Sequence, residues 1–243
     1  MVITSKSNPL IKEISKLSDK KFRRLCGKYV VEGLKPVREC IAAGCKIFNI
    51  VCAEGLENEF ENAVVVSKAV FDSLSSEVTP QGVLAVVEIP SNALKAPEGS
   101  CILLDHIQDP GNLGTVIRTA NAAGYGEIYL INCTDPYSPK AVRASMSGIF
   151  FVKVYQGSDS EVLSVLNDVP IICADMDGVD LFSFNPPEKF CLCIGNEGNG
   201  ISQEIMDKAQ FKVSIPMRET CESLNAAVSA GIVMYQLKYD KKR

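Results

Sequence analysis

The sequence lacks the features that would place the protein in a membrane or direct it to secretion. Its 243 residues contain no run of about eighteen apolar residues, so we expect no membrane span and no membrane partner. The first 17 residues contain neither an apolar signal segment nor a small-residue cleavage site. The sequence therefore predicts a cytoplasmic protein. Apolar residues make up 47% and charged residues 22%, which excludes a wholly disordered chain.

Histidine and paired cysteines are also scarce, which restricts the chemistry that the chain can perform. His106 is the single histidine, and none of the ten cysteines belongs to a CxxC pair. One histidine cannot serve a Ser-His-Asp triad and a His-rich metal site at once. Several cysteines lie inside apolar runs such as residues 190–194, where cysteine behaves as a small hydrophobe. We expect buried reduced thiols, no disulfides and no metal.

Positive charge is in deficit over the whole chain but is concentrated at its N-terminal end. The formal net charge is −4 at pH 7. Residues 1–46 contain 11 Lys and Arg and 4 Asp and Glu, which gives +7, and the remainder therefore carries −11. This asymmetry favours a polyanionic partner for the N-terminal end. A solvated helical face would produce the same pattern.

The succession of helices and strands predicts two α/β parts. Residues 1–93 alternate short strands with helices, and residues 94–99 lie in a stretch rich in Pro, Ser and Gly that predicts a linker. Residues 100–243 alternate apolar strands with helices, which predicts a mostly parallel sheet covered on both faces. Functional sites in such sheets lie at the carboxyl ends of the strands.

One candidate segment, residues 109–124, follows the first strand predicted after the linker. Its turn residues lead into a helix that Asn112 could cap, and Arg118 lies off the apolar stripe of that helix. A long helical side chain leans toward the N-terminus, so Arg118 could help form an anion or phosphate pocket there. A capped helix with a solvated arginine explains the same residues.

Two further candidate segments also follow predicted strands. Residues 194–202 surround Asn196 and Glu197 with three glycines, which allows close backbone approach to a ligand but also suits a surface turn. Residues 214–237 end a strand and begin a helix dense in small residues, which indicates a buried core helix or a subunit interface. The G-x-G-x-x-G fingerprint is incomplete at Gly124 and precedes a strand, so dinucleotide binding by an oxidoreductase is not supported.

The three segments together, in this order and spacing, resemble the SpoU/TrmH family of RNA ribose 2′-O-methyltransferases in the SPOUT superfamily. The matching motifs are DPGNLGTVIRTA, IGNEGNG and IPM followed by SLN, and the resemblance spans roughly residues 100 to 240. The segments ITSKSNPLIKEISKL, YVVEGLKPVREC and TPQGVLAVV resemble the family's N-terminal RNA-binding domain. The resemblance implies an α/β chain with a C-terminal trefoil knot, bound S-adenosylmethionine, and a homodimer with its active site at the subunit interface.

The resemblance also implies roles for individual residues. The matching catalytic positions are Asn112, Arg118, Glu197, Ser223 and Asn225. The matching cofactor positions are Gly195, Ile215, Met217 and Leu224. Arg143 matches a segment associated with RNA or site assembly. The charge asymmetry, and not the resemblance, adds Lys20, Lys21, Arg23 and Arg24 of the basic N-terminal stretch as RNA-binding candidates. Glu219 stands where the family often has glycine, so the loop that borders the cofactor departs from the family pattern at this residue.

The resemblance therefore predicts methyl transfer from S-adenosylmethionine to a ribose 2′-hydroxyl of structured RNA, ribosomal RNA in preference to tRNA. Arg118 would act as the base or as an electrostatic stabiliser. The alternatives are a tRNA 2′-O-methyltransferase and a non-catalytic RNA-binding or ribosome-assembly protein on the same fold. The intact residues at the five catalytic positions argue against the non-catalytic alternative.

Overall fold

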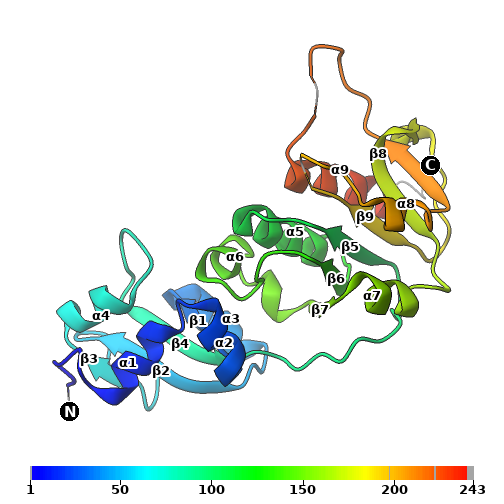
Figure 1. The fold of residues 1–243 in the computed structure, drawn as a ribbon. Helices are drawn as coiled ribbons and strands as arrows, with labels where there is room; N and C mark the ends of the chain where they lie inside the picture. Colours follow the sequence, from blue (N-terminus) through cyan, green and yellow to red (C-terminus); the bar gives the residue numbers. More distant parts are fainter. Residues whose placement is uncertain (1, 197, 222, 240–243) are drawn as a thin grey trace. The chain divides into compact units, whose positions relative to one another are not determined.

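The computed structural model describes residues 2–196, 198–221 and 223–239, which pack as two compact units (Figure 1). Unit 1 comprises the described residues of 2–91 and 135–150, and unit 2 comprises those of 92–134 and 151–239. Glu197, one of the predicted catalytic residues, lies outside the described residues. No helix of the described chain is long and apolar enough to cross a membrane.

Unit 1 is built on a four-stranded sheet in which β4 is central. The strand order is β1 (Lys28–Glu32), β4 (Val83–Glu88), β2 (Ile47–Ala53) and β3 (Val64–Val66). β4 runs antiparallel to β1 and β2, and β2 runs parallel to β3. The helices of unit 1 are α1 (Pro9–Lys16), α2 (Lys20–Cys26), α3 (Leu34–Ala42), α4 (Lys68–Leu74), α6 (Pro139–Ala144) and the 3₁₀ turn η1 (Gly148–Phe150).

The first helix illustrates how local sequence positions the elements of unit 1. The side chain of Asn8 accepts a hydrogen bond from Leu10 N (2.9 Å) and Pro9 opens the helix, as the sequence predicts. Ile11 and Ile14 then face the core, where they pack with residues of α4, β2 and β4. The periodic apolar stripe thus fixes the side of α1 that covers the sheet.

Residues 135–150 pack in unit 1, although the sequence analysis groups them with the C-terminal part of the chain. The contact that explains this is long-range in sequence. Arg23, 3% exposed, pairs with buried Asp135 at 2.6 Å, and the rings of Tyr29 and Tyr137 lie 5.0 Å apart. A buried ion pair and two buried aromatic rings therefore join this segment to α2 and β1.

Unit 2 contains a six-stranded sheet whose neighbouring strands all pair in parallel. The strand order is β10 (Phe211–Ser214), β8 (Ile171–Asp180), β9 (Cys191–Ile194), β5 (Cys101–Asp105), β6 (Glu127–Ile131) and β7 (Lys153–Gly157). The parallel sheet predicted from the apolar strands is confirmed. The trefoil knot stays a prediction.

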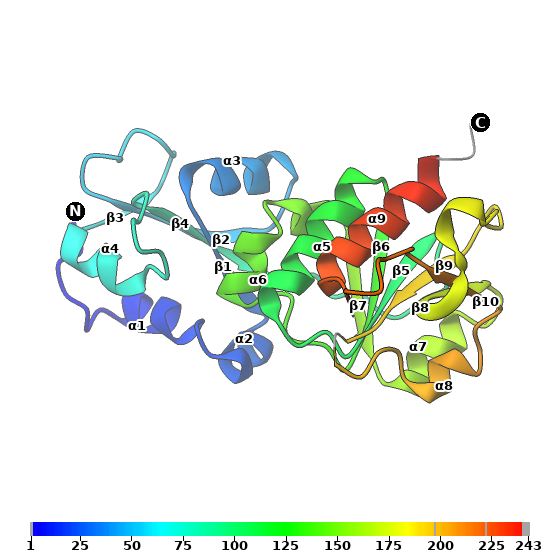
Figure 2. The ribbon, with the colours of Figure 1, turned by 90° about the horizontal axis from the view of Figure 1, so that it is seen from above.

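Helices cover both faces of this sheet (Figure 2). They are α5 (Pro110–Ala122), α7 (Asp159–Val165), α8 (Gln203–Met206), α9 (Ala226–Tyr239) and the 3₁₀ turn η2 (Leu181–Ser183). α5 and α9 pack against each other on one face, and α7 and α8 lie on the other. Strand residues alternate between these two layers, which is why β5, β6 and β9 are buried along their whole length.

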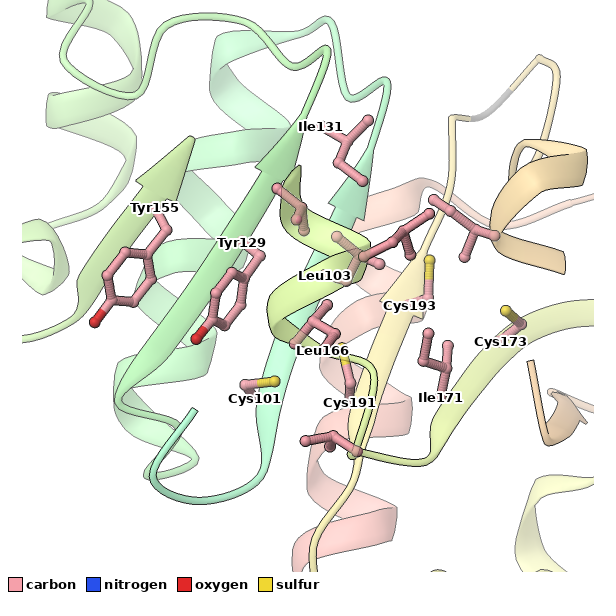
Figure 3. Close-up of a cluster of buried hydrophobic side chains, with 14 residues drawn as sticks. Cys101, Leu103, Tyr129, Ile131, Tyr155, Leu166, Ile171, Cys173, Cys191 and Cys193 are labelled. Carbon is pink, nitrogen blue, oxygen red and sulfur yellow. The ribbon is translucent and has the colours of Figure 1, made fainter. Parts of the chain in front are cut away.

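The core beneath α7 and α8 holds four cysteines in neighbouring strands (Figure 3). Cys101 lies opposite Cys191, and Cys173 lies opposite Cys193. Burial raises the pKa of Cys191 and Cys193 well above the usual value for a thiol. All ten cysteines are free: six are buried, Cys26, Cys45 and Cys133 are partly buried, and Cys221 is exposed.

Candidate active site

A cavity of about 400 Å³ opens where β9 and β10 end in unit 2. Its wall includes residues 194–196 and 198–200 at the end of β9, residues 215 and 217 after β10, and the first residues of α9. β10 pairs with residues 172–173 of β8 and then with residues 179–180. The residues of β8 between these two pairings leave the ladder and complete the wall. Volume and position match those of ligand pockets in parallel sheets.

The four predicted cofactor residues all line this cavity. They are Gly195, Ile215, Met217 and Leu224. The side chains of Ile215, Met217 and Leu224 supply an apolar surface, and Ser223, a predicted catalytic residue, adds a hydroxyl. Asp175 and Asp177 add carboxylates on the β8 side. The cavity therefore combines apolar and hydrogen-bonding surface, as a site for a polar cofactor with a flat ring requires.

Gly195 is needed for the tight turn that forms one wall. The backbone groups of Asn196 and Gly200 exchange two hydrogen bonds, of 3.0 and 2.9 Å. A Cβ at Gly195 would lie 2.4 Å from the carbonyl carbon and oxygen of Gly200. No side chain fits there, so the turn closes only because residue 195 is glycine.

Asp105 and Asn196 hold this turn against the end of β5, and the sequence motifs predict a role for neither. The buried carboxylate of Asp105 accepts hydrogen bonds from Ser202 N (2.7 Å) and from His106 Nδ1 (2.6 Å). Asn196 Nδ2 donates to His106 O (3.0 Å), while Asn196 Oδ1 accepts from Gly198 N (2.8 Å). His106 adopts a left-handed conformation, with φ of 56°. An acidic residue at the end of an apolar strand was the available sequence signal for Asp105.

A second set of contacts joins the start of α5 to the start of α9. Asn225 Nδ2 donates to Asn112 Oδ1 (3.0 Å), so the structure brings these two predicted catalytic residues together. Asn225 Oδ1 also accepts from Ala227 N (3.0 Å) and thereby caps α9. The prediction that Asn112 caps α5 is wrong. The cap is Asp109, whose side chain accepts a hydrogen bond from the backbone N–H of Asn112 (2.9 Å). Asp109 precedes Pro110 and therefore occupies the N-cap position itself.

Arg118 contributes no side chain to the wall of the cavity, and the same is true of Asn112 and Asn225. Arg118 is an exposed side chain in the middle of α5, and it is not among the described residues that line the cavity. The sequence predicts that Arg118 lies off the apolar stripe of its helix, and its exposure is consistent with this. The stripe residues Leu113, Val116 and Ile117 are buried. The guanidinium is thus accessible to a large substrate.

The predicted RNA-binding residues differ in their exposure within unit 1. Lys20, Lys21 and Arg24 are exposed on α2. Arg23 is buried, and its guanidinium is committed to Asp135, so we leave it out of the set that could contact RNA. Arg143 is exposed on α6, where it donates to Ser76 Oγ (2.8 Å) and pairs with Glu77 (2.5 Å).

The parallel sheet, the cavity at its carboxyl edge and the adjoining asparagine pair define an α/β enzyme that binds a small cofactor. Residues 99–235 match the model of the SpoU rRNA Methylase family, and residues 8–85 match the MRM3-like substrate binding domain. The chain therefore belongs to the SpoU rRNA Methylase family.

Two curated relatives and one solved structure are consistent with membership of this family. The chain is 29% identical to the 23S rRNA (guanosine(2553)-2'-O)-methyltransferase RlmP of Bacillus subtilis, over 97% of this chain and 98% of that protein. It is 28% identical to the 23S rRNA (uridine(2479)-2'-O)-methyltransferase of Streptomyces viridochromogenes, over 90% and 85%. The crystal structure of an AdoMet-bound rRNA methyltransferase from Sinorhizobium meliloti superimposes with a TM-score of 0.90 and 28% identity, over 100% and 99%.

These findings confirm the resemblance to the SpoU/TrmH family, the α/β fold and the class of RNA 2′-O-methyltransferase that uses S-adenosylmethionine. The residues of the cavity fit this cofactor. Ile215, Met217 and Leu224 would contact the adenine ring and the methionine chain, and the carboxylates of Asp175 and Asp177 would accept hydrogen bonds from hydroxyl or ammonium groups. Gly195 leaves the backbone of the turn free of a side chain.

Proposed function

We propose that this protein methylates a ribose 2′-hydroxyl of ribosomal RNA and holds S-adenosylmethionine in the cavity of unit 2. The observation that carries the proposal is that all four predicted cofactor residues line one cavity. The preference for ribosomal RNA over tRNA rests on relatives named as 23S rRNA methyltransferases that align along both units. We also propose that no metal takes part and that the protein acts in the cytoplasm.

The chemistry needs an aligned ribose oxygen and stabilisation of the charge that develops on it. Bound S-adenosylmethionine supplies an electrophilic methyl group. Arg118 is a cationic side chain, so we assign it to stabilise the 2′ oxygen. That oxygen would lose its proton to water and bond to the methyl carbon while the carbon–sulfur bond of the cofactor breaks and its electron pair stays on sulfur. The hydrogen bond between Asn112 and Asn225 fixes the helix that carries Arg118 against the segment that walls the cavity. Such fixed placement is a large part of the rate gain in group transfer.

The exposed cations of α2 support a role of unit 1 in holding RNA. Lys20, Lys21 and Arg24 project charge into solvent, and cations of this kind bind phosphates and release counterions. Affinity for RNA should therefore fall with salt. Replacing all three with alanine should flatten this salt dependence.

We further propose a homodimer that forms through α9. This helix combines small residues with large apolar side chains that stay exposed, namely Val228, Tyr235 and Tyr239. An exposed apolar surface on one helix is typical of an interface between subunits. Sedimentation at micromolar concentration should show a dimer, and a fully active monomer would exclude this part of the proposal.

The decisive experiment is methyl transfer from labelled S-adenosylmethionine to purified ribosomal RNA and tRNA, followed by mapping of the 2′-O-methyl position. We expect labelling of ribosomal RNA alone. Arg118→Ala should abolish transfer while titration calorimetry shows cofactor affinity unchanged within about twofold. Asn121→Ala, an exposed change on the same helix, is the matched control and should retain activity. Labelling of tRNA alone would overturn the proposed substrate.

A further inference from the structure

Unit 1 contains a second cavity, of about 430 Å³, that the methyl-transfer site does not use. It is enclosed by α1, β1, α3, residues 74–81 and residues 139–150, all of which belong to unit 1. Its volume lies within the range of roughly 300–1,000 Å³ that ligand pockets occupy. Unit 1 therefore holds a space large enough for a small molecule or for one part of a larger one.

The walls of this cavity are suited to a flat, uncharged ring. Leu17, Val142 and the ring of Phe150 contribute apolar surface. The charged residues of the wall are Lys35, Arg143, Glu32, Glu39 and Glu77. Carboxylates thus outnumber cations, which disfavours a phosphate. An apolar wall with hydrogen-bonding groups at its edge favours a heterocyclic ring instead.

Arg143 is held at the wall by a chain of hydrogen bonds. Its Nη2 donates to Ser76 Oγ (2.8 Å) and its Nε pairs with Glu77 Oε1 (2.5 Å). Ser76 in turn donates from its backbone N–H to Glu32 Oε2 (3.1 Å). A guanidinium fixed in this way offers its plane and its remaining N–H groups in a defined position, and both stack on and hydrogen-bond to nucleobases.

The rim of the cavity carries two consecutive strained residues. Met146 and Ser147 have φ values of 44° and 68°, in the left-handed region that residues other than glycine seldom adopt. Both line the cavity, and Met146 is 57% exposed. Strained backbone beside a cavity is a feature that clusters at ligand sites.

We propose that this cavity receives one unpaired base of the RNA substrate. This inference rests on the proposed function, because the base must come from the RNA that the enzyme methylates. Proteins recognise RNA sequence mainly through unpaired bases that leave the stack and lie against aromatic rings or guanidinium planes. The base is the one uncharged, flat component of RNA, so it matches a wall in which acidic groups exceed basic ones. Unit 1 thus reads one base, while the exposed cations of α2 contact phosphates.

The absence of tryptophan from the chain provides a specific optical probe for this cavity. Phe150→Trp places a single indole in the wall, and Phe48→Trp places one on an exposed surface of β2, outside the residues that line the cavity. We expect a single-stranded RNA oligonucleotide and at least one of the four nucleoside monophosphates to quench Phe150→Trp in a saturable way. Ribose 5-phosphate, which lacks a base, should quench neither variant. Equal responses of the two variants, or quenching by ribose 5-phosphate, would overturn the inference.

A blocking variant tests the same inference through catalysis. Ser15 is an exposed residue of α1 at the cavity, and Ser15→Trp should raise the KM for ribosomal RNA at least tenfold while kcat and cofactor affinity stay unchanged. Ser73→Trp, at an exposed residue of α4 that is not among the residues that line the cavity, is the matched control and should leave KM unchanged. An unchanged KM in Ser15→Trp, with a melting curve like that of the wild type, would contradict the proposed base-binding site and leave the proposed function unaffected. Absence of methyl transfer by the wild-type protein contradicts the proposed function instead.

Discussion

Arg23 joins residues 135–150 to the rest of unit 1, and its replacement tests this packing quantitatively. The side chains of Arg23 and Asp135 are 3% and 9% exposed. Arg23 donates to Asp135 Oδ2 from Nε (3.0 Å) and from Nη2 (2.6 Å). Its Nη1 donates to the carbonyl oxygens of Leu17 (2.7 Å) and Ser18 (2.8 Å). Every nitrogen of the guanidinium therefore has an acceptor inside the unit.

Arg23→Met keeps the apolar stem but removes the charge and all four hydrogen bonds. It leaves the Asp135 carboxylate buried without its cation, and removing one member of a buried pair costs about 3–5 kcal/mol. Asp135 Oδ1 still accepts from Tyr137 N (2.9 Å), which places the expected loss near the lower end of that range. We expect the free energy of unfolding to fall by about 3 kcal/mol. Adding Asp135→Asn removes the isolated charge and should restore about 1–2 kcal/mol.

Urea unfolding at pH 7, followed by far-UV circular dichroism, measures this loss. Amide hydrogen exchange should be measured as well, because the two units need not unfold together. It should assign the decrease in the free energy of unfolding to unit 1. Arg24→Met is the matched control, since Arg24 is the exposed neighbour and should change stability by no more than about 0.5 kcal/mol. A loss below about 1 kcal/mol for Arg23→Met, or equal losses for the two variants, would refute the reasoning.

Three further predictions concern the site and the core of unit 2. Gly195→Ala should lower S-adenosylmethionine affinity at least tenfold by titration calorimetry, because the new Cβ would lie 2.4 Å from the facing turn, whereas Gly126→Ala adds a Cβ in open space and should change nothing. Asn225→Ala breaks the hydrogen bond to Asn112 at the start of α5 and should lower kcat at least tenfold, as measured by single-turnover methyl transfer. Circular dichroism should show an intact fold, and the control Asn121→Ala should leave kcat unchanged. Burial raises the pKa of Cys133 from 9.0 to about 12, so the unfolded chain loses this proton first as pH rises. The free energy of unfolding should fall between pH 9 and pH 12, by at most about 1.4 kcal/mol per pH unit from this thiol, and the fall should be smaller in Cys133→Ala.

The kind of sheet in unit 2 could be predicted from sequence, but its strand order could not. Five-residue, mostly apolar strands such as β5 and β6 indicate burial on both faces, which is typical of a parallel sheet between two helical layers. The order places β9 between β8 and β5. This order depends on pairings between strands far apart in the chain, and the periodicity of a single strand contains no information about its partner.

The packing of residues 135–150 in unit 1 could not be predicted from the local sequence either, because it also depends on residues far apart in the chain. Arg23 and Arg24 are adjacent in one basic run, and composition makes them equivalent RNA-binding candidates. Asp135 lies 112 residues away and makes Arg23 a buried structural residue, while Arg24 stays exposed. A long-range partner, and not the local sequence, thus distinguishes a buried cation from a surface cation.

The site was more predictable where backbone geometry itself demands a residue type. Glycine at residue 195 is required by the closure of its turn, and that demand is visible in the sequence. Residues that act by holding other residues leave a weaker signal. Asp105 ends an apolar strand and Asn196 stands among glycines, and either could be an ordinary turn residue until their partners are known.

The stretch from Asp105 to Asn112 connects the two halves of the site. Asp105 holds the loop after β9 through a buried carboxylate, and the left-handed turn at His106 presents the carbonyl oxygen that Asn196 binds. The chain then enters α5, where Asn112 meets Asn225 at the start of α9. Because one short segment positions both the turn that walls the cavity of unit 2 and the helix that carries Arg118, a backbone shift in it must move both. If the proposed site is correct, a substitution that shifts the end of β5 should therefore change both S-adenosylmethionine affinity and the rate of methyl transfer.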